Sequence, residues 1–381
     1  MLSNSDLIEL TEFRRALHRR PELSGAEGET ARTIAAALRA LSATRVLTGI
    51  GGHGVAAVFD SGAPGPTVLF RAELDALPIA ETSGAAWASA IPGNGHLCGH
   101  DGHMAMLLGL GRLISRRPPK TGRIVLLFQP AEEIGSGARA VINDPAFTAI
   151  APDYAFAIHN LPGLPLSHVG LRAGLMNCAS VGLAIHLTGK TAHAATPETG
   201  ISPGPALARL IAALPDLGPG GALDDTFRLL TVTHAQLGEA TFGVAPGAAM
   251  LHVTLRSAQD ATLADLEAQT RAMAAQEAAH GGLMLRIETC EPFAATINDA
   301  QAVMLARSAL DQLQVPHSED GVPMHASEDF GLFGHGAKSA MLCLGAGQTH
   351  PALHNPDYDF PDDLIAIGPK IFAQIARDIL G

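Results

Sequence analysis

Charged residues are scarce in this chain, and basic residues are scarcer than acidic ones. Only 16% of the 381 residues are charged, and the 37 acidic side chains outnumber the 25 basic ones, which gives a formal net charge of -12 at pH 7. A surface that binds nucleic acid or an anionic membrane needs clustered positive charge. Neither is therefore an expected partner of this protein.

Aromatic residues and long apolar runs are also few. Aromatics make up 4% of the chain, with one Trp and two Tyr, so no stacking pocket for a substrate can be recognised. No run approaches the roughly 20 apolar residues that a membrane-spanning helix requires. The four cysteines, at positions 98, 178, 290 and 343, lack the spacing of a disulfide framework.

The N-terminal segment, residues 1–25, has the pattern of an amphipathic helix with acidic side chains early and basic side chains late. It lacks the apolar core of a signal peptide. Together with cysteines that suit a reducing compartment, this pattern predicts a cytoplasmic protein.

Hydrophobic residues, in contrast, make up 47% of the chain, and its length exceeds the usual size of a single core. Short β-rich apolar segments at 67–70, 123–128 and 154–158 each end in polar residues. Helix patterns at 102–114 and 137–142 alternate with them. Buried parallel strands have this pattern, with chemistry at their carboxyl ends, so we expect an α/β domain.

Past about residue 178 the pattern changes to half-exposed strands and amphipathic helices. The expected strands are 181–189, 227–237 and 250–257, and the expected helices are 205–217 and 263–280. Two helices on one face of a small antiparallel sheet form an economical α+β arrangement.

After Pro292 the α/β pattern returns, with helices at 301–313 and 364–380 and a strand at 339–345. We therefore expect a larger, discontinuous domain, residues 1–178 and 292–381, into which a smaller domain, residues 179–291, is inserted.

The densest cluster of polar side chains is HLCGHDGH at residues 96–103, between a strand-like and a helix-like apolar run. It holds a thiol, three imidazoles and a carboxylate. A Cys98 thiolate and a neutral His100 are good ligands for a borderline ion such as zinc. Metal chemistry is therefore the first hypothesis.

Further polar residues follow other strands or apolar runs. They are Asp75, Glu132, Glu133, His159, His193 and His354. Adjacent glutamates are commonly solvated. Here, however, FQPAEE follows an apolar strand and Pro130 restricts the turn, so at least one carboxylate is expected to point into the crevice at the strand ends. One glutamate can then bind metal while the other accepts a proton from the attacking water.

Five donors form the expected ligand set, one more than the four of a tetrahedral ion, and two ions that share a ligand would account for the surplus. The set is Cys98, His100, Glu133, His159 and His354. Taken singly, each imidazole is as readily a core histidine, and a single cysteine is more often an inert buried residue.

Asp75 and Asp101 are candidates to accept hydrogen bonds from the free ring N–H groups of these imidazoles. For Asp101, which directly precedes a helix pattern, helix capping is an equal alternative.

Six segments in order along the chain resemble hippurate hydrolases and indole-acetyl-amino-acid hydrolases, the amidohydrolase branch of the aminoacylase and carboxypeptidase metallopeptidases. The segments are HLCGHDGHMAMLLG (96–109), FQPAEEIGSGARAVI (128–142), AIHNLPG (157–163), GKTAHAATP (189–197), SEDFG (327–331) and LHNPDYDF (353–360).

The resemblance implies a mixed, largely parallel sheet flanked by helices in a domain that binds two divalent ions, Zn²⁺ or Mn²⁺, with Co²⁺ or Ni²⁺ as alternatives. The inserted domain would be a lid that also forms a homodimer. By this resemblance Cys98 bridges the ions, His100 and His159 complete one ion's ligands, and Glu133 and His354 complete the other's.

The same resemblance makes Glu132 the general base. It also implies that His193, in the inserted domain, reaches an active site, usually that of the partner subunit, and stabilises the tetrahedral oxyanion. Without the resemblance, His193 would be an ordinary surface residue.

Two positions depart from the pattern of the relatives. Glu73 stands where they often have Asp, a mild change. Gly243 stands where they commonly have an Asn that is expected to help hold the substrate. Arg256 remains where a family arginine can bind a carboxylate with two parallel hydrogen bonds, although an exposed arginine at a strand end is the alternative.

The sequence therefore predicts a metal-dependent amidohydrolase that cleaves the amide bond of a small N-acyl amino acid, hippurate-like or N-acetylated, to a carboxylic acid and an amino acid. A dipeptidase or carboxypeptidase with the same centre is the alternative within the class. A non-catalytic binding protein is disfavoured, because such a protein could lose Glu132 without penalty.

Overall fold

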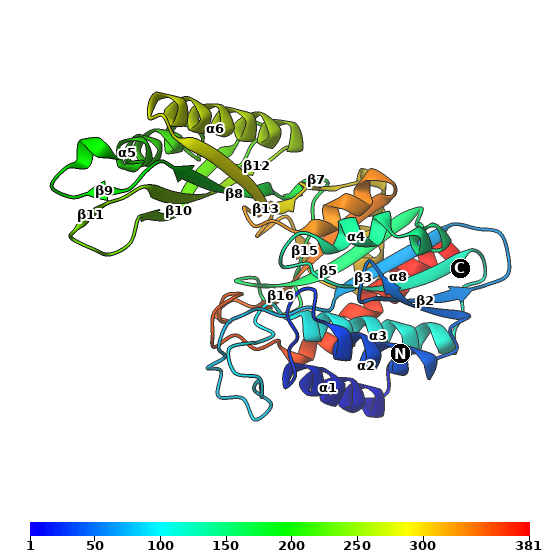
Figure 1. Cartoon of the computed structure of the whole chain (residues 1–381). Coiled ribbons are helices and arrows are strands. Elements are labelled where there is room, and N and C mark those ends of the chain that lie inside the picture. Colours follow the sequence, from blue (N-terminus) through cyan, green and yellow to red (C-terminus); the bar gives the residue numbers. More distant parts are fainter. The chain divides into compact units, whose positions relative to one another are not determined.

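The computed structural model describes all 381 residues, which form two compact units. The first comprises Met1–Met176, Thr296–Met324 and Glu328–Gly381, and the second comprises Asn177–Ala295 with the short segment His325–Ser327. The expected insertion at 179–291 lies inside the second unit. Each unit has its own main sheet (Figure 1). No helix is long and apolar enough to cross a membrane.

An eight-stranded sheet, in the order β1-β2-β4-β3-β5-β16-β6-β15, forms the centre of the first unit. Its strands are β1 (Arg45–Ile50), β2 (Gly54–Asp60), β3 (Thr67–Glu73), β4 (Arg123–Gln129), β5 (Tyr154–Pro162), β6 (Val169–Gly170), β15 (His317–Ser318) and β16 (Lys338–Gly347). The central strands β4, β3, β5 and β16 are parallel neighbours, whereas β1–β2, β2–β4 and β16–β6 are antiparallel. The expectation of a mixed, largely parallel sheet is confirmed.

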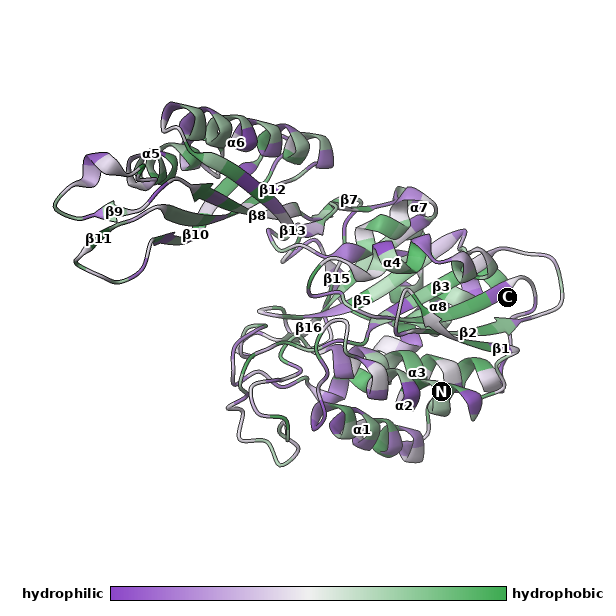
Figure 2. Ribbon diagram, in the orientation of Figure 1, coloured by the Kyte–Doolittle hydropathy of each residue, from purple (hydrophilic) through white to green (hydrophobic).

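Helices flank this sheet, with α1, α2 and α3 on one side and α4 on the other (Figure 1). The helices of the unit are α1 (Asn4–His18), α2 (Gly28–Arg39), α3 (His100–Arg116), α4 (Gly137–Asn143), α7 (Ala300–Leu313) and α8 (Gly368–Leu380). Because both faces are covered, β3 is buried along its whole length, and the central strands are mostly apolar (Figure 2).

A four-stranded antiparallel sheet, ordered β10-β12-β8-β13, forms the second unit with two helices that contact each other and the sheet. Its elements are β8 (Ala179–Thr188), α5 (Gly204–Ala213), β10 (Arg228–Leu237), β12 (Ala248–Ser257), α6 (Asp260–His280) and β13 (Met284–Phe293). On β12, buried side chains alternate with more exposed ones, because one face packs on the helices.

The sequence analysis missed β13, as well as α2, β1 and β2 in the first unit. Strand β13 is an edge strand whose side chains are all exposed or half-buried, so it carries only a weak apolar signal.

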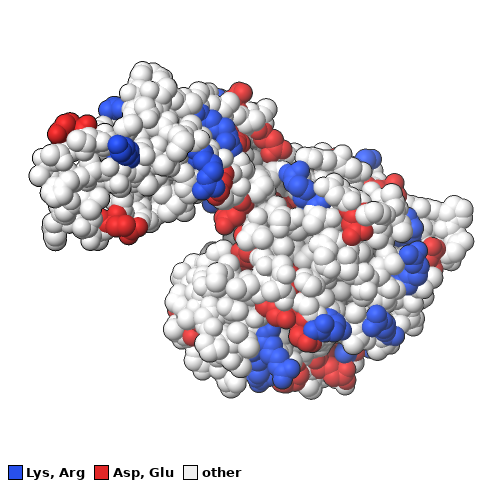
Figure 3. Space-filling model, viewed as in Figure 1, with Lys and Arg blue, Asp and Glu red and all other residues white.

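A further two-stranded ladder joins β9 (Ala192–His193) to β11 (Val244–Ala245). On the face in Figure 3, Lys and Arg are interspersed with Asp and Glu and form no continuous basic surface.

Candidate metal centre and active site

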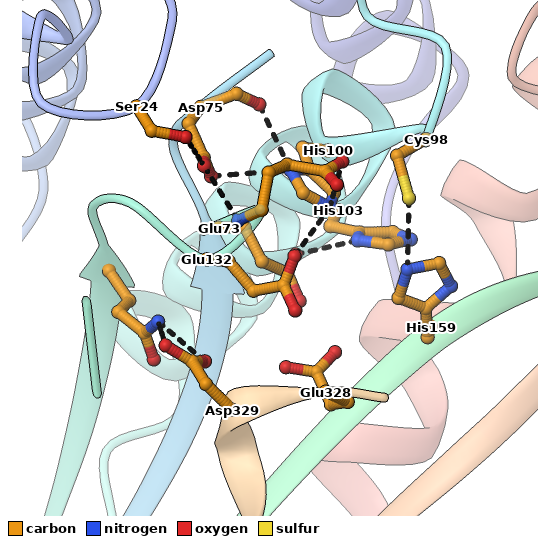
Figure 4. A network of polar contacts seen from close by, with 12 residues as sticks. Ser24, Glu73, Asp75, Cys98, His100, His103, Glu132, His159, Glu328 and Asp329 are labelled. Atoms are coloured by element: carbon orange, nitrogen blue, oxygen red, sulfur yellow. Dashed lines mark hydrogen bonds and ion pairs between the residues drawn. The ribbon is translucent and has the colours of Figure 1, made fainter. Parts of the chain in front are cut away.

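The predicted ligands of the first unit come together at the carboxyl ends of its central parallel strands. Figure 4 shows three of them, Cys98, His100 and His159. Asp75 follows β3, the pair Glu132–Glu133 follows β4, and His159 lies near the end of β5. Helix α3 begins at His100, one residue after Gly99, which has a φ of 91°. The parallel arrangement therefore brings side chains that are far apart in sequence to one edge of the sheet.

The five predicted ligands form two groups that share one residue. Cys98, His100 and His159 form the first, Cys98, Glu133 and His354 form the second, and within each group the ligand atoms lie within 4.8 Å of one another. Cys98 is thus the side chain common to both groups. This is the same division of ligands that the resemblance implies.

Hydrogen bonds on the far side of the rings orient His100 and His159. The Nδ1 atom of His100 lies 2.9 Å from the carbonyl oxygen of Asp75, and Nδ1 of His159 lies 2.7 Å from that of Asn160. A carbonyl oxygen only accepts, so Nδ1 carries the proton in both rings. Each histidine consequently presents Nε2 to the cluster, and Nε2 of His159 lies 3.4 Å from Sγ of Cys98.

Buried polar atoms without partners mark the centre of the cluster. Nε2 of His100 and Oε1 of Glu133 are buried and make no hydrogen bond, and they lie 3.8 Å apart. Leaving such an atom unpartnered costs about 1–3 kcal/mol. Cations bound in the two groups would satisfy both atoms, and thiolate, imidazole and carboxylate are suitable ligands for a divalent ion. The residues present therefore fit a metal centre.

The cluster holds protons when no cation is present. Although burial alone lowers the pKa of His100, the carboxylates of Glu73 and Asp75 raise it to about 10. Burial raises the pKa of Glu133 to about 7 and, together with the charge of Glu133, raises the pKa of the Cys98 thiol well above its usual value. Bound cations would reverse these shifts because they favour the deprotonated ligands.

Glu132 is buried beside the ligands and forms two groups of potential ligand atoms, one with His100 and Glu133 and one with Glu328 and Asp329. Its Oε2 lies 3.9 Å from Nε2 of His100, and its carboxylate lies within 4.8 Å of those of Glu328 and Asp329. Burial raises the pKa of Glu132 well above its usual value, and the charge of Glu328 raises it further. Glu132 is thus placed to hold or accept a proton next to the candidate metal ligands.

Sequence analysis missed the buried arginine that balances this carboxylate group. The Arg71 guanidinium forms ion pairs with Glu73, with Glu328 at 2.7 Å and with Asp329 at 2.7 Å. A signal was available, since arginine is almost never fully buried unless it is paired, and Arg71 stands within an apolar strand. Two of its acidic partners, Glu328 and Asp329, lie in the segment SEDFG, for which the sequence analysis predicted no function.

Asp75 and Asp101 differ in their contacts. Besides its carbonyl contact with His100, Asp75 accepts hydrogen bonds from the Ser24 hydroxyl at 2.7 Å and from the backbone N–H of Glu133 at 3.0 Å. Asp101 instead contacts Nδ1 of His18 at 2.8 Å and Nη1 of Arg14 at 3.2 Å. The structure therefore places Asp101 against α1 and not against a predicted metal-binding imidazole, because it faces away from His100 on the first turn of α3.

Two non-glycine residues with left-handed backbone lie in the site, Ala131 at φ 51° and His354 at φ 65°. Such conformations cost on the order of 1–3 kcal/mol and persist where surrounding contacts hold them. The N–H of Ala131 donates to buried Glu27 at 2.8 Å, and the N–H of His354 donates to the Leu97 carbonyl at 2.8 Å. These turns aim Glu132 and His354 at the cluster.

The other predicted site residues lie in the second unit. His193 is exposed on β9 and pairs with Val244 of β11, and the N–H of Ala194 donates to the Gly243 carbonyl at 3.1 Å. Arg256 is half-buried, and its Nη1 donates to the Ser327 hydroxyl at 2.8 Å. His193 and Gly243 are therefore neighbours, and Arg256 is not a free surface arginine.

Comparison with known proteins shows to which family this chain belongs. The family model of peptidase family M20/M25/M40 matches residues 69–378. The chain belongs to this family. As an M20-family protein it is a hydrolase of amide bonds, as the sequence analysis expected.

Relatives match the chain over nearly its full length. An N-acetylcysteine deacetylase of Bacillus subtilis (strain 168) is 28% identical over 97% of this chain and 97% of its own. A hippurate hydrolase of Campylobacter jejuni is 29% identical over 98% of this chain and 97% of its own. The crystal structure of the Bacillus subtilis YXEP protein, described as a dinuclear metal-binding peptidase of the M20 family, has a TM-score of 0.82 and 26% identity, with coverage of 100% and 99%.

Proposed function

We propose that this M20-family protein is a di-metal amidohydrolase that cleaves N-acyl amino acids to a carboxylic acid and an amino acid. The observation that carries the proposal is the pair of ligand groups that share Cys98, next to the buried carboxylate of Glu132, which lies close to His100 and Glu133. Relatives named for hippurate and for N-acetylcysteine support the substrate class.

Cys98 would bridge two divalent ions, with His100 and His159 on one and Glu133 and His354 on the other. Zn²⁺ and Mn²⁺ are the proposed ions, and Co²⁺ and Ni²⁺ are alternatives. Bound there, the ions would polarise the scissile carbonyl and lower the pKa of the attacking water.

Glu132 would act as the general base. It accepts the proton of the attacking water and then returns that proton to the leaving nitrogen. Arg71 would offset part of the negative charge of the neighbouring Glu328 and Asp329, because its guanidinium pairs with both. A glutamate with a raised pKa is suited to both halves of this proton transfer.

Residues of the second unit would complete the site. His193 would stabilise the tetrahedral oxyanion in the active site of a partner subunit, so the active form would be a homodimer in which the second unit serves as lid and interface. Arg256 would bind the substrate carboxylate. We further propose that the protein acts in the cytoplasm, because its cysteines lack the spacing of a disulfide framework.

A hydrolysis screen tests the proposal. The metal-reconstituted protein is assayed with a panel of N-acetyl and N-benzoyl amino acids beside a panel of dipeptides, and the Glu132→Gln protein is the matched control. Turnover of acyl amino acids that the control loses is the expected result. Faster turnover of dipeptides would make the protein a dipeptidase, and no turnover of either panel would contradict an enzymatic function.

A further inference from the structure

Asn160, at the carboxyl end of β5, is fully buried and makes five hydrogen bonds around the cluster. Its side-chain Nδ2 donates to the Cys98 carbonyl at 2.7 Å and to Nε2 of His103 at 3.1 Å. Its Oδ1 accepts from the hydroxyl of buried Tyr358. Its backbone N–H donates to Nε2 of His103 at 3.1 Å, and its carbonyl accepts from Nδ1 of His159 at 2.7 Å.

These contacts leave only one orientation for the Asn160 amide. A carbonyl oxygen cannot donate, so the amide atom beside the Cys98 carbonyl must be the nitrogen. The hydroxyl of Tyr358 then donates to the amide oxygen. One side chain consequently holds the backbone of Cys98, while the carbonyl of the same residue fixes the ring of His159.

His103 completes the network and is not available to a metal ion. Its Nδ1–H donates a hydrogen bond to Oε2 of Glu73 at 2.6 Å, and its Nε2 accepts hydrogen bonds from the backbone N–H and from Nδ2 of Asn160. Both ring nitrogens are therefore used. Although His103 forms a potential ligand group with Glu73 and His100, it has no lone pair to offer an ion.

The close fit of this network restricts the neighbouring backbone. A Cβ atom on Gly99 would meet both the amide of Asn160 and the hydroxyl of Tyr358. Gly99 also has a φ of 91°, a conformation that favours glycine. The turn that separates Cys98 from His100 is thus built directly against Asn160.

We propose that Asn160 is a positioning residue that holds Cys98 and His159 in the geometry in which they bind metal, and that His103 orients Asn160 and is not a ligand. This inference rests on the proposed metal centre. It assigns a role to three buried residues, Asn160, His103 and Tyr358, that are not among the proposed metal ligands.

The test compares metal binding by the wild-type protein, Asn160→Asp, Tyr358→Phe and a control, Asn298→Asp. Asn298 is a matched control because it is also buried and its Nδ2 also makes two hydrogen bonds, in its case to the carbonyl groups of Arg172 and Met341. Metal content, affinity against a competing chelator and the thiolate-to-cobalt absorption of the Co²⁺-loaded protein are measured, together with unfolding temperature.

Asn160→Asp keeps the shape but replaces a donor with an acceptor opposite the Cys98 carbonyl. We expect a loss of metal affinity of about 10–100-fold, as is typical when a residue behind a ligand is changed, and a weakened thiolate-to-cobalt band. Tyr358→Phe, which removes one hydrogen bond and keeps the packing, should show a smaller loss in the same direction. Asn298→Asp should lower the unfolding temperature without changing affinity or spectrum.

Wild-type affinity and spectrum in both Asn160→Asp and Tyr358→Phe would overturn the inference while leaving the metal centre intact. An equal loss of affinity in Asn298→Asp would also overturn it, because the effect would then be general destabilisation. A wild-type protein that binds no pair of ions would overturn the proposed function itself, and this inference with it.

Discussion

Sγ of Cys98 and Nε2 of His159 lie 3.4 Å apart, although 61 residues separate them in the sequence. Both residues are buried, and Asn160 holds them from behind: its Nδ2 donates to the Cys98 carbonyl, and its carbonyl accepts from Nδ1 of His159. The Cys98 thiol and Nε2 of His159 are therefore positioned to bind the same ion. The first prediction concerns this thiol.

Bound metal should protect the Cys98 thiol from an alkylating reagent. Because the thiol is buried and its pKa is raised, the labelling is done at alkaline pH with excess reagent, where we expect a slow but measurable reaction of the metal-free protein. Labelling is followed by peptide mass spectrometry with and without added Zn²⁺. Exposed Cys290 serves as an internal control whose labelling should not depend on metal. Equal labelling of Cys98 in both states would make it a bystander.

Metal affinity should rise with pH across the neutral range. The pKa of His100 is about 10 in the metal-free protein and that of the Cys98 thiol lies well above its usual value, so both hold protons at pH 7 that must leave when metal binds. Each released proton makes the affinity rise by about tenfold per pH unit below these pKa values. Competition titrations between pH 6 and 9 check this, and a flat profile would mean that the ligands are already deprotonated.

His193 should act in the active site of a partner subunit. Mixtures of His193→Ala and Glu132→Gln chains would then regain activity, because each heterodimer holds one site with both residues intact. The activity of the mixture is compared with that of each variant alone, after subunit exchange has been shown with tagged chains. If exchange occurs and activity does not return, His193 acts in its own subunit or has no part in catalysis.

Gly243→Asn should strengthen the binding of hippurate-like substrates. A Cβ atom at Gly243 would meet nothing within 4 Å and the backbone is not left-handed, so the side chain fits. One added hydrogen bond contributes roughly 0.5–1.5 kcal/mol. Michaelis constants for hippurate are compared among wild type, Gly243→Asn and Gly243→Ala, the last of which adds a Cβ without a donor. Equal constants would show that this position does not set specificity.

Arg256→Ala provides the complementary measurement. If Arg256 carries the carboxylate selectivity, its loss should weaken hippurate and leave the carboxamide of hippurate unchanged. Tight hippurate binding that survives Arg256→Ala would place the carboxylate elsewhere.

Most of the fold could be predicted from apolar runs and helical periodicity in the sequence. Apolar runs that end in polar residues marked β3, β4 and β5, and parallel strands bring those ends together. The edge strand β13 could not be found in this way, because its side chains are only partly buried. The spacing of apolar residues indicates which side chains are buried, and an edge strand such as β13 has few buried side chains.

Some residues of the candidate site could be recognised from the sequence and others could not. Residues whose types carry chemistry, such as Cys98 and Glu132, stand out in the sequence. Asn160 and Arg71 do not, because their roles depend on partners 62 and 257 residues away along the chain. The contacts of Asp101 could not be read from the sequence either, because its partners His18 and Arg14 lie 83 and 87 residues away along the chain.

Glu132→Gln tests the central claim most directly. The amide keeps the shape of the side chain but cannot accept the proton of the attacking water, so we predict unchanged metal content with turnover lowered by about 10² to 10⁴. Metal content by elemental analysis and turnover of an N-acyl amino acid are measured on the same preparation. Two bound ions with turnover near zero would support the account, whereas two bound ions with near-normal turnover would remove Glu132 from the mechanism and contradict it.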